Sequence, residues 1–285
     1  MNIFAPIISA FNTFLFIPIV NLLVVLYHGF NFIHIPYALG FSIIALTVLI
    51  RLVLYPLTNS QLKASKKMQE LTPHINKLKE KHKNDAKTLQ AETMKLYKEF
   101  GVNPAAGCLP VLIQLPLIWA LYQALQLIVK PGAAVLAEIN HMLYSNSLRL
   151  TSSWDVTFFT LPLALKPSEM FKPDSPITWL ILLIPIATGV FQFIQTKMML
   201  APQVLGKDGK LAKKDEKKKE DFATAFQSQS LYIFPVMIAF FSWGFPIGIS
   251  LYWNTFTVFG IIQQYRVSGL GGLKQWTDKL YGKSK

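Results

Sequence analysis

The sequence is poor in cysteine and in charged residues, and its first fifty residues carry no charged side chain. Its only cysteine is Cys108, so no disulfide can form within the chain and no cysteine cluster can bind zinc. Charged residues make up 15% of the chain, compared with about a quarter in soluble domains. Residues 1–50 contain no Lys, Arg, Asp or Glu, which argues against a cleaved secretory signal and a mitochondrial transit peptide. The lack of an Arg-rich transit peptide favours a bacterial envelope over an organelle.

Hydrophobic residues make up 52% of the chain and gather in long windows. Uncharged apolar stretches of about twenty residues are typical of transmembrane helices. The sequence therefore predicts an all-α polytopic membrane protein. Near the junction of the last two windows, Trp243, Phe245 and Tyr252 are predicted to anchor the outer helix ends as an aromatic belt. The windows lie at residues 4–27, 37–57, 105–129, 177–200, 231–245 and 247–265.

The net charge of +13 could indicate nucleic-acid binding, but in a membrane protein the distribution of Lys and Arg sets the topology. Segment 61–100 has ten lysines against five acidic residues, and segment 207–221 has seven against five. The tail after Tyr265 is also basic, whereas segment 130–176 has four basic and four acidic residues. Because basic connections stay in the cytoplasm, we expect 61–100, 201–229 and the tail there, and 130–176 outside.

The first window has two interpretations. If it spans the membrane, the protein has six spans and a cytoplasmic N-terminus. If it lies flat in the outer interface, there are five spans and the N-terminus is outside. Prolines and polar residues interrupt this window more than the others, and we therefore favour an interfacial helix. The interrupting residues are Pro6, Asn12, Pro18, Asn21, His28 and Asn31.

The predicted protein is thus a five-span helical bundle with a cytoplasmic helical hairpin and an N-terminal interfacial helix. Its parts, in chain order, are the interfacial helix (1–36), the first core span (37–58), the cytoplasmic hairpin (59–102), the second core span (103–129), an external segment (130–176), the third core span (177–200), a cytoplasmic loop (201–229), the fourth core span (230–245), the fifth core span (246–267) and a basic cytoplasmic tail (268–285).

The hairpin is predicted from two apolar stripes at helical spacing. Asn84-Asp85 between them is a turn signal, and Asp85 can cap the second helix. We expect the stripes to face each other, with the alternative that one of them rests on the membrane surface. The first stripe comprises Met68, Leu71, Ile75 and Leu78, and the second Leu89, Thr93, Leu96, Tyr97 and Phe100.

Arg51 is the one charge in the otherwise uncharged stretch 40–57. With the cytoplasmic end near Thr58, a rise of 1.5 Å per residue places Arg51 roughly 10 Å below that surface. An arginine at the centre of a span costs about 2.5–3.5 kcal/mol or more, so such residues usually face a bundle interior or a water-filled cavity. The alternative is that the side chain snorkels to phosphate. The functional interpretation is a hydrated cationic pocket open to the cytoplasm.

Polar residues in other spans lie at a similar depth. Gln114, Gln195 and Gln263 fall in the cytoplasmic halves of their windows, as Arg51 does. Each alone is most often a hydrogen-bonding contact between helices, but together they could line one groove. The five core spans contain no Asp, Glu or His that could neutralise Arg51. A cation without an acidic partner suits a site that receives an anion from elsewhere.

Three ordered motifs now support a resemblance. One is Asn103-Pro104-Ala105-Ala106-Gly107-Cys108-Leu109-Pro110, followed by Gln114 and Pro116. The second runs from Gly40-Phe41-Ser42 through Arg51 to Tyr55-Pro56-Leu57-Thr58, and the third is Pro246-Ile247-Gly248-Ile249-Ser250-Leu251-Tyr252-Trp253-Asn254. In order and spacing these motifs resemble the YidC/Oxa/Alb insertase family, over about residues 12 to 267.

The resemblance implies a five-span bundle that encloses a hydrophilic groove, open to cytoplasm and lipid but closed outside. Arg51 would be the groove's arginine, and Gln114, Gln195 and Trp253 would belong to its lining. The implied function is a membrane protein insertase and chaperone, which moves short polar tails through the groove and releases apolar segments into lipid. This needs no catalytic residue, nucleotide, metal or other cofactor, so we expect no enzyme. The resemblance leaves the long external segment 130–176 without an explanation.

The expected partners are nascent membrane proteins and anionic lipids. The lysines of the hairpin and tail also suit ribosomal RNA phosphate, without recognition of a specific nucleic-acid sequence, and lipid and ribosome stay equal alternatives here. Participation of a Sec translocon is left open. The expected location is the bacterial plasma (inner) membrane, as a multi-pass protein with a cytoplasmic C-terminus.

Two other functions compete with insertion. A small-solute secondary transporter would be expected to show internal repeats and paired ionisable groups, and no clear repeat is present. A non-catalytic assembly scaffold is the other alternative, and it predicts that Arg51 is dispensable. An intramembrane protease is poorly supported, because the histidines lie outside the core spans; they are His28, His34, His74, His82 and His141.

The predicted topology can be tested by cysteine labelling. A cysteine at Asn146 should react with a membrane-impermeant reagent in intact cells, and one at Lys213 should not, because only the first position is predicted outside. The unsubstituted chain, which carries only Cys108, gives the background. Swapped labelling of the two positions would overturn the assignment.

Overall fold

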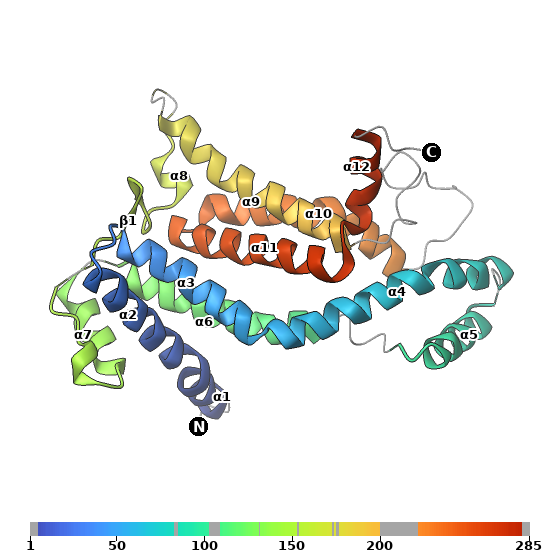
Figure 1. Cartoon of the computed structure of the whole chain (residues 1–285), viewed down its shortest axis with the longest axis horizontal. Coiled ribbons are helices and arrows are strands. Elements are labelled where there is room, and N and C mark those ends of the chain that lie inside the picture. The colour runs from blue at the N-terminus through green and yellow to red at the C-terminus, as the bar shows by residue number, and fades with distance from the viewer. Residues whose placement is uncertain are drawn as a thin grey trace. The chain divides into compact units, whose positions relative to one another are not determined.

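Apolar windows fold as helices because a helix satisfies its own backbone N–H and C=O groups, which lipid cannot do. The computed structural model describes residues 5–82, 85–102, 109–130, 132–152, 154–172, 174, 177–199 and 222–280, and it is mostly helical (Figure 1). Its helices are α1 (Ala5–Phe11), η1 (Asn12–Phe16), α2 (Ile17–Phe32), α3 (Ala38–Val53), α4 (Tyr55–Lys81), α5 (Ala86–Glu99), α6 (Leu109–Ile128), α7 (Ala133–Met142), η3 (Asn146–Leu148), α8 (Pro167–Met170), α9 (Ile177–Met199), α10 (Phe222–Gly244), α11 (Ile247–Ser268), η5 (Gly271–Leu273) and α12 (Lys274–Leu280).

The first of two compact units comprises Met1–Val53, Val111–Gly189 and Met237–Thr257. Helices α2 and α3 lie side by side in it (Figure 1). Its core is built from aliphatic side chains of these helices together with residues of α6 and of the first turns of α11. Fully or almost fully buried members include Val20, Leu23, Val24, Leu39, Ile43, Leu121, Ile128 and Ile247.

Hydroxyl groups join the helices of this unit inside the apolar core. Ser242 of α10 lies 2.8 Å from Ser250 of α11 and 3.2 Å from Thr188 of α9, measured between side-chain oxygens. All three side chains are buried. Because lipid offers these hydroxyls no partner, they hydrogen-bond across the helix interface. The network therefore ties α9, α10 and α11 together.

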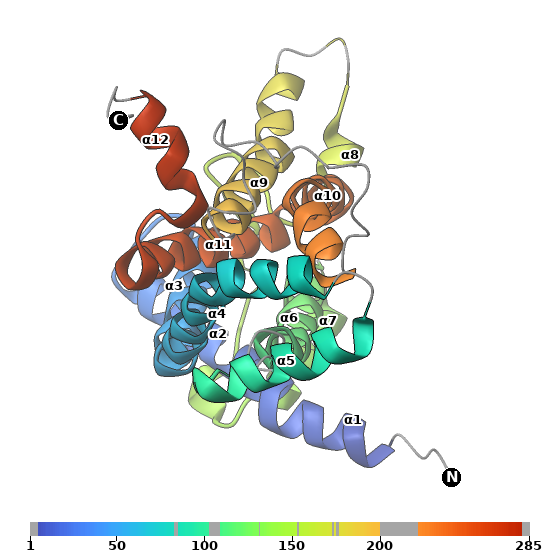
Figure 2. The ribbon, with the colours of Figure 1, turned by 90° about the vertical axis from the view of Figure 1, so that its right-hand side faces the viewer.

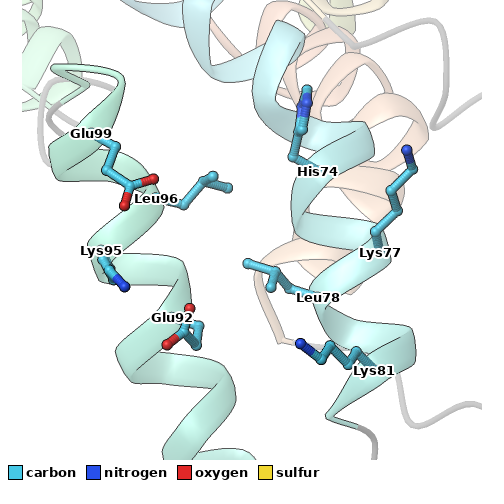
Figure 3. Close-up of a pocket in the computed structure, with 8 residues that line it drawn as sticks. All are labelled: His74, Lys77, Leu78, Lys81, Glu92, Lys95, Leu96 and Glu99. Carbon is cyan, nitrogen blue, oxygen red and sulfur yellow. The ribbon is translucent and has the colours of Figure 1, made fainter.

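The second unit comprises Leu54–Pro110, Val190–Val236 and Val258–Lys285. It contains α4 and α5, two helices where the stripes predicted a helical hairpin, and the two contact each other (Figure 2). Between them lies a pocket of about 270 Å³. Figure 3 shows Leu78 of α4 and Leu96 of α5, one from each stripe, pointing toward one another across it. Charged side chains and a histidine form the rest of its lining, namely His74, Lys77, Lys81, Glu92, Lys95 and Glu99.

Membrane-spanning length is reached by two described helical segments on their own. They are Ala5–Phe32, which joins α1, η1 and α2, and Thr178–Met199. Helices α3 and α4, separated only by Leu54, pass the same test when they are taken together. By length and composition the N-terminal segment therefore suits a span as well as the predicted interfacial helix. The five-span count stays a prediction.

The structure departs from the sequence reading in two places. The segment predicted to lie outside includes a short antiparallel hairpin, β1 (Thr157–Phe158) with β2 (Leu161–Pro162), whereas the other regular elements of the described residues are helices. Strands of two residues carry no periodicity from which they could be predicted. Helix α10 also begins at Phe222, inside the segment 201–229 that was predicted as a loop. An apolar window ends where the residues become polar, but a helix can continue through polar residues until a Gly or Pro ends it.

Asp85 forms the predicted cap of α5. One carboxylate oxygen accepts a hydrogen bond from the Thr88 backbone N–H at 3.0 Å, and the other accepts one from the Thr88 hydroxyl at 2.6 Å. An N-cap side chain satisfies a backbone donor that has no partner within the helix. The capping prediction is confirmed, whereas Asn84 lies outside the described residues.

The cap makes the stability of α5 depend on pH. The Thr88 side chain and backbone hold the pKa of Asp85 below its ordinary value of 3.8. Since the folded value is depressed, the stabilisation is present at neutral pH and is lost as the pH falls from 3.8 through the lower folded value. We expect Asp85→Ala to speed amide hydrogen exchange across residues 86–99 at neutral pH. Asp85→Asn should protect these amides nearly as well, because Asn caps comparably, but without the acid-dependent loss. Identical exchange in all three proteins would contradict the capping role.

Candidate functional site

Arg51 lies in the last turn of α3, and only 6% of its side-chain surface is exposed. One terminal guanidinium nitrogen, Nη2, donates a hydrogen bond of 2.7 Å to the backbone carbonyl of Phe256 in α11. The guanidinium carbon also lies 3.3 Å from the centroid of the Phe256 ring. One residue of α11 thus binds the cation twice, through a carbonyl dipole and through the negative face of an aromatic ring.

These partners are neutral, so they stabilise the charge of Arg51 without cancelling it. Among the described residues, no carboxylate forms an ion pair with Arg51. Its Nε is buried and has no hydrogen-bond partner within the described part of the chain. A buried donor of this kind calls for water or a polar ligand. The geometry therefore fits a cation that can accept an anionic group.

Tyr252 and Gln114 extend the polar site. Tyr252 lies one turn before Phe256 in α11, is 3% exposed, and has its ring centroid 5.8 Å from that of Phe256. Its hydroxyl lies within electrostatic reach of Arg51 and of the Gln114 side chain in α6. Neither the Tyr252 hydroxyl nor the Gln114 Nε2 makes a hydrogen bond of normal geometry to a described residue. Three buried polar atoms from three helices therefore lie together, and none of them has a hydrogen-bond partner outside this cluster among the described residues.

Three of the four predicted groove residues lie in the first unit, and the fourth, Gln195, lies in the second. Arg51 and Gln114 come close to the same residue, Tyr252. Trp253 follows Tyr252 in α11 and is partly buried against the core of the first unit. Gln195 is partly buried in the stretch of α9 that belongs to the second unit. Its place in a groove with Arg51 stays a prediction.

Two sequence interpretations are settled by the contacts. Tyr252 was predicted in the outer aromatic belt, and this is wrong because its side chain is buried beside Arg51. The spacing of four residues between Tyr252 and Phe256 was the available signal, since it puts both rings on one helix face. Gln263 forms a contact between helices: its side-chain amide donates to the Thr58 hydroxyl at 2.6 Å and to the Tyr55 carbonyl at 3.2 Å. The alternative of a plain helix–helix contact is therefore the one observed for Gln263.

A second buried cation, Lys197 near the end of α9, was missed. It is 1% exposed, and its Nζ lies 2.8 Å from the centroid of Trp276 in α12 and 5.7 Å from that of Phe193. The neighbouring Met198 carbonyl accepts a hydrogen bond of 3.3 Å from the Gln264 side chain. Lys197 is a charge inside the window 177–200, which was a signal like that of Arg51. It was passed over because it stands near the window's end, where a lysine usually reaches the membrane surface.

Within the described ranges, no group of three His, Cys, Asp or Glu residues could hold a metal ion. Cys108 and the motif residues 103–108 lie outside those ranges. The described site is therefore a cationic and polar one, built from α3, α6 and α11. It belongs to a helical membrane protein that carries an arginine in one of its apolar helices.

Comparison with known proteins gives the family. Residues 30–270 match the model of the 60Kd inner membrane protein family. The chain is 31% identical over 232 residues to the membrane protein insertase YidC of Fusobacterium nucleatum, covering 81% of this chain and 87% of that protein. It is 33% identical over 238 residues to YidC of Streptomyces avermitilis, covering 81% of this chain and 51% of that one. It is also 30% identical over 277 residues to the chloroplastic inner membrane protein ALBINO3 of Arabidopsis thaliana, covering 90% and 52%.

The chain therefore belongs to the YidC/Oxa/Alb family, and the resemblance found in the sequence motifs is confirmed. It is a membrane protein. It spans about half the length of ALBINO3 and of the Streptomyces protein, and most of the Fusobacterium one.

Proposed function

We propose that this protein is a membrane protein insertase and chaperone of the bacterial plasma membrane. The observation that carries the proposal is the Arg51 cation, which is held by the carbonyl and ring of Phe256 rather than by a carboxylate of the described chain. Relatives that are named membrane protein insertases support the same function. In the proposed topology five spans follow an interfacial N-terminal helix, the α4–α5 hairpin is cytoplasmic, and the C-terminus is cytoplasmic.

The first step is recognition of a polar tail. An acidic side chain of the incoming segment accepts hydrogen bonds from the Arg51 guanidinium, whose planar donors match a carboxylate. The amide of Gln114 and the hydroxyl of Tyr252 offer further hydrogen bonds to the backbone of the tail, because neither has a described partner outside the cluster that they form with Arg51. Gln195 and Trp253 would extend this lining as a hydrophilic groove. A polar peptide thereby exchanges water for protein partners part of the way across the membrane.

The second step is release. The apolar segment that follows the tail leaves water for lipid, which contributes about 25 cal/mol per Å² of buried apolar surface. This transfer drives insertion, so the groove needs neither a nucleotide nor a metal. As the tail leaves Arg51, the carbonyl and ring of Phe256 take up the guanidinium again. A carboxylate partner within the protein would compete with the substrate at this position.

Substitution of Arg51 tests the proposal. Arg51→Ala should slow insertion of substrates with acidic translocated tails by roughly ten- to a hundredfold, because a charge-assisted hydrogen bond contributes about 1.5–3 kcal/mol. Arg51→Lys should retain much of the activity, since a cation remains. Substrates whose tails carry Asn and Gln instead should be less affected. The measurement is insertion into liposomes that contain the purified protein.

Arg266→Ala is the matched control, because it removes one arginine from an exposed position of α11. It should leave the ratio of acidic to neutral insertion unchanged. Protein abundance should also stay normal in Arg51→Ala, since removal of a buried cation relieves its desolvation cost. Insertion of acidic and neutral tails by Arg51→Ala at the rates of the unsubstituted protein would favour an assembly scaffold.

We propose in addition that the basic tail contacts ribosomal RNA during insertion, with anionic lipid as the competing polyanion. Trp276 in this tail packs on Lys197, so truncation would disturb α9 as well as remove charge. Replacing Lys274, Lys279, Lys283 and Lys285 by Gln should weaken cosedimentation with ribosomes in detergent at low salt. It should also reduce the salt dependence, because fewer counterions are released. The same four lysines replaced by Arg form the control, and equal binding by the Gln variant at every salt concentration would remove the tail from docking.

A further inference from the structure

The external segment 130–176 has no part in the proposed function so far, yet it is attached to four helices of the first unit. Its described parts are α7, η3, the β1–β2 hairpin and α8. In Figure 1 α7 and β1 lie near the ends of α2 and α3 that the α2–α3 turn connects. The stretch from Trp154 to Leu165 makes the contacts that bear on the Arg51 site.

One contact is with the first turn of α11. The backbone N–H groups of Ile247 and Gly248 donate to the carbonyls of Leu165 and Leu163, each at 3.0 Å. Such N–H groups have no acceptor inside their own helix, so the loop after β2 provides the acceptors that α11 lacks. Leu163 is completely buried, and a Cβ added at Gly248 would come within 3.4 Å of its carbonyl oxygen. The loop is thus fixed closely against the start of α11.

A second contact is with the start of α3. The Phe158 ring of β1 packs directly on the backbone of Gly40, where a Cβ would overlap the ring. The same ring lies 5.3 Å from that of Phe41, centroid to centroid. Phe159 at the hairpin tip lies 5.1 Å from Tyr37. Position 40 therefore requires glycine for a steric reason, because the Phe158 ring occupies the space of a side chain.

The turns that meet here are held in an unfavourable backbone conformation. Phe159 and Thr160 form the hairpin turn with φ of 46° and 70°, and His34 and Tyr37 of the α2–α3 turn have φ of 56° and 59°. Turns of this kind favour Gly and Asn, and a β-branched residue rarely adopts positive φ. Such strain persists where the surroundings determine the conformation. Here the contacts of Tyr37 with the Phe158 and Phe159 rings fix the conformation of both turns.

Further contacts fix the rest of the segment. The Trp154 indole donates a hydrogen bond of 2.9 Å to the Ile128 carbonyl in the last turn of α6, and its ring lies 5.1 Å from Tyr27 of α2. The buried Asn21 of α2 donates to the Met142 carbonyl at 2.9 Å and accepts from the Tyr144 backbone at 2.8 Å. The hairpin is consequently supported from α2 and α6 while it contacts α3 and α11.

We propose that residues 154–165 form a brace that holds α3 and α11 at a fixed spacing and thereby positions Arg51 on Phe256. The contact points are Gly40 on α3 and Gly248 on α11, which lie about 16 Å and 12 Å from Arg51 and Phe256 at 1.5 Å per residue. Between them Ile43 of α3 packs within 4 Å of the Gly248 position. Phe158 and Leu163 are accordingly positioning residues for the Arg51 site. Any effect of these two residues on insertion rests on the function proposed above for Arg51.

The test measures how accessible Arg51 is, independently of insertion. Phenylglyoxal modifies arginine, and the chain has three described arginines: Arg51 is buried, while Arg149 and Arg266 are exposed. In the full protein in liposomes, Phe158→Ala should raise the modification rate of Arg51 several-fold, measured by mass spectrometry. The rates at Arg149 and Arg266 should not change. Gly40→Ala should have the same effect, because the added methyl group displaces the Phe158 ring from the backbone of residue 40.

The pairing of Gly40 with Phe158 provides an internal check. In Gly40→Ala/Phe158→Ala the new methyl group enters space that the ring has left, so the Arg51 rate should be lower than in Gly40→Ala alone. Tyr144→Ala is the matched control, because it removes an exposed aromatic side chain of the same segment and should leave Arg51 protected. If Gly40→Ala accumulates poorly, Phe158→Leu, which adds no atoms at the contact, replaces it.

Unchanged Arg51 modification in the Phe158 variants would overturn the brace. Increased modification together with a reduced preference for acidic tails supports both the brace and the proposed function. Increased modification with insertion of acidic tails unaffected supports the brace and counts against the role of Arg51 in insertion. The two proposals therefore fail on different measurements.

Discussion

The Arg51 site carries a net positive charge inside an apolar bundle, because the partners of the guanidinium in α11 are neutral and leave that charge uncancelled. A hydrogen bond to the Phe256 carbonyl and the face of the Phe256 ring replace part of the hydration that the guanidinium loses. A carboxylate in the same place would bind it more tightly but would neutralise the site, and two buried ions have to repay a larger desolvation cost. The rest of the site depends on this arrangement. Tyr252 and Gln114 present polar atoms that have no described partner outside the cluster, beside a cation that is held in place.

Lys197 follows the same principle in the second unit. Its ammonium group lies on the face of Trp276 and is nearly completely covered. In both cases an aromatic ring supplies a negative face without contributing a titratable group. The two cations differ in what surrounds them. Arg51 adjoins buried polar atoms that lack partners, whereas Lys197 is covered by a helix of the basic tail. Only the first arrangement leaves hydrogen-bonding capacity for a tail that passes by.

The sequence predicted what local pattern and composition encode. Apolar windows gave the helices, the spacing of Leu78 and Leu96 placed them on facing stripes, and Asp85 was found as a cap from its position alone. Arg51 stood out because a charge in an apolar window is expensive. Tyr252 was misplaced, since hydropathy does not tell a buried aromatic residue from an interfacial one. Lys197 and the β1–β2 hairpin were missed because only tertiary contacts, with Trp276 and with Gly40, define their roles.

The proposed brace, residues 154–165, would be useful to the Arg51 site because it adds directional and steric contacts to the packing of α3 and α11. A guanidinium that lies 3.3 Å from a ring centroid loses much of its attraction if the two helices separate by a small distance. Apolar helix faces alone specify spacing loosely, because lipid competes with them almost equally well. The hydrogen bonds from Ile247 and Gly248 to the loop are directional, so they allow little movement. The contact of the Phe158 ring with Gly40 is steric and also allows little movement. Positive φ values at Phe159 and Thr160 are tolerable in that setting, since relaxing either turn would break contacts that hold α3 and α11 together.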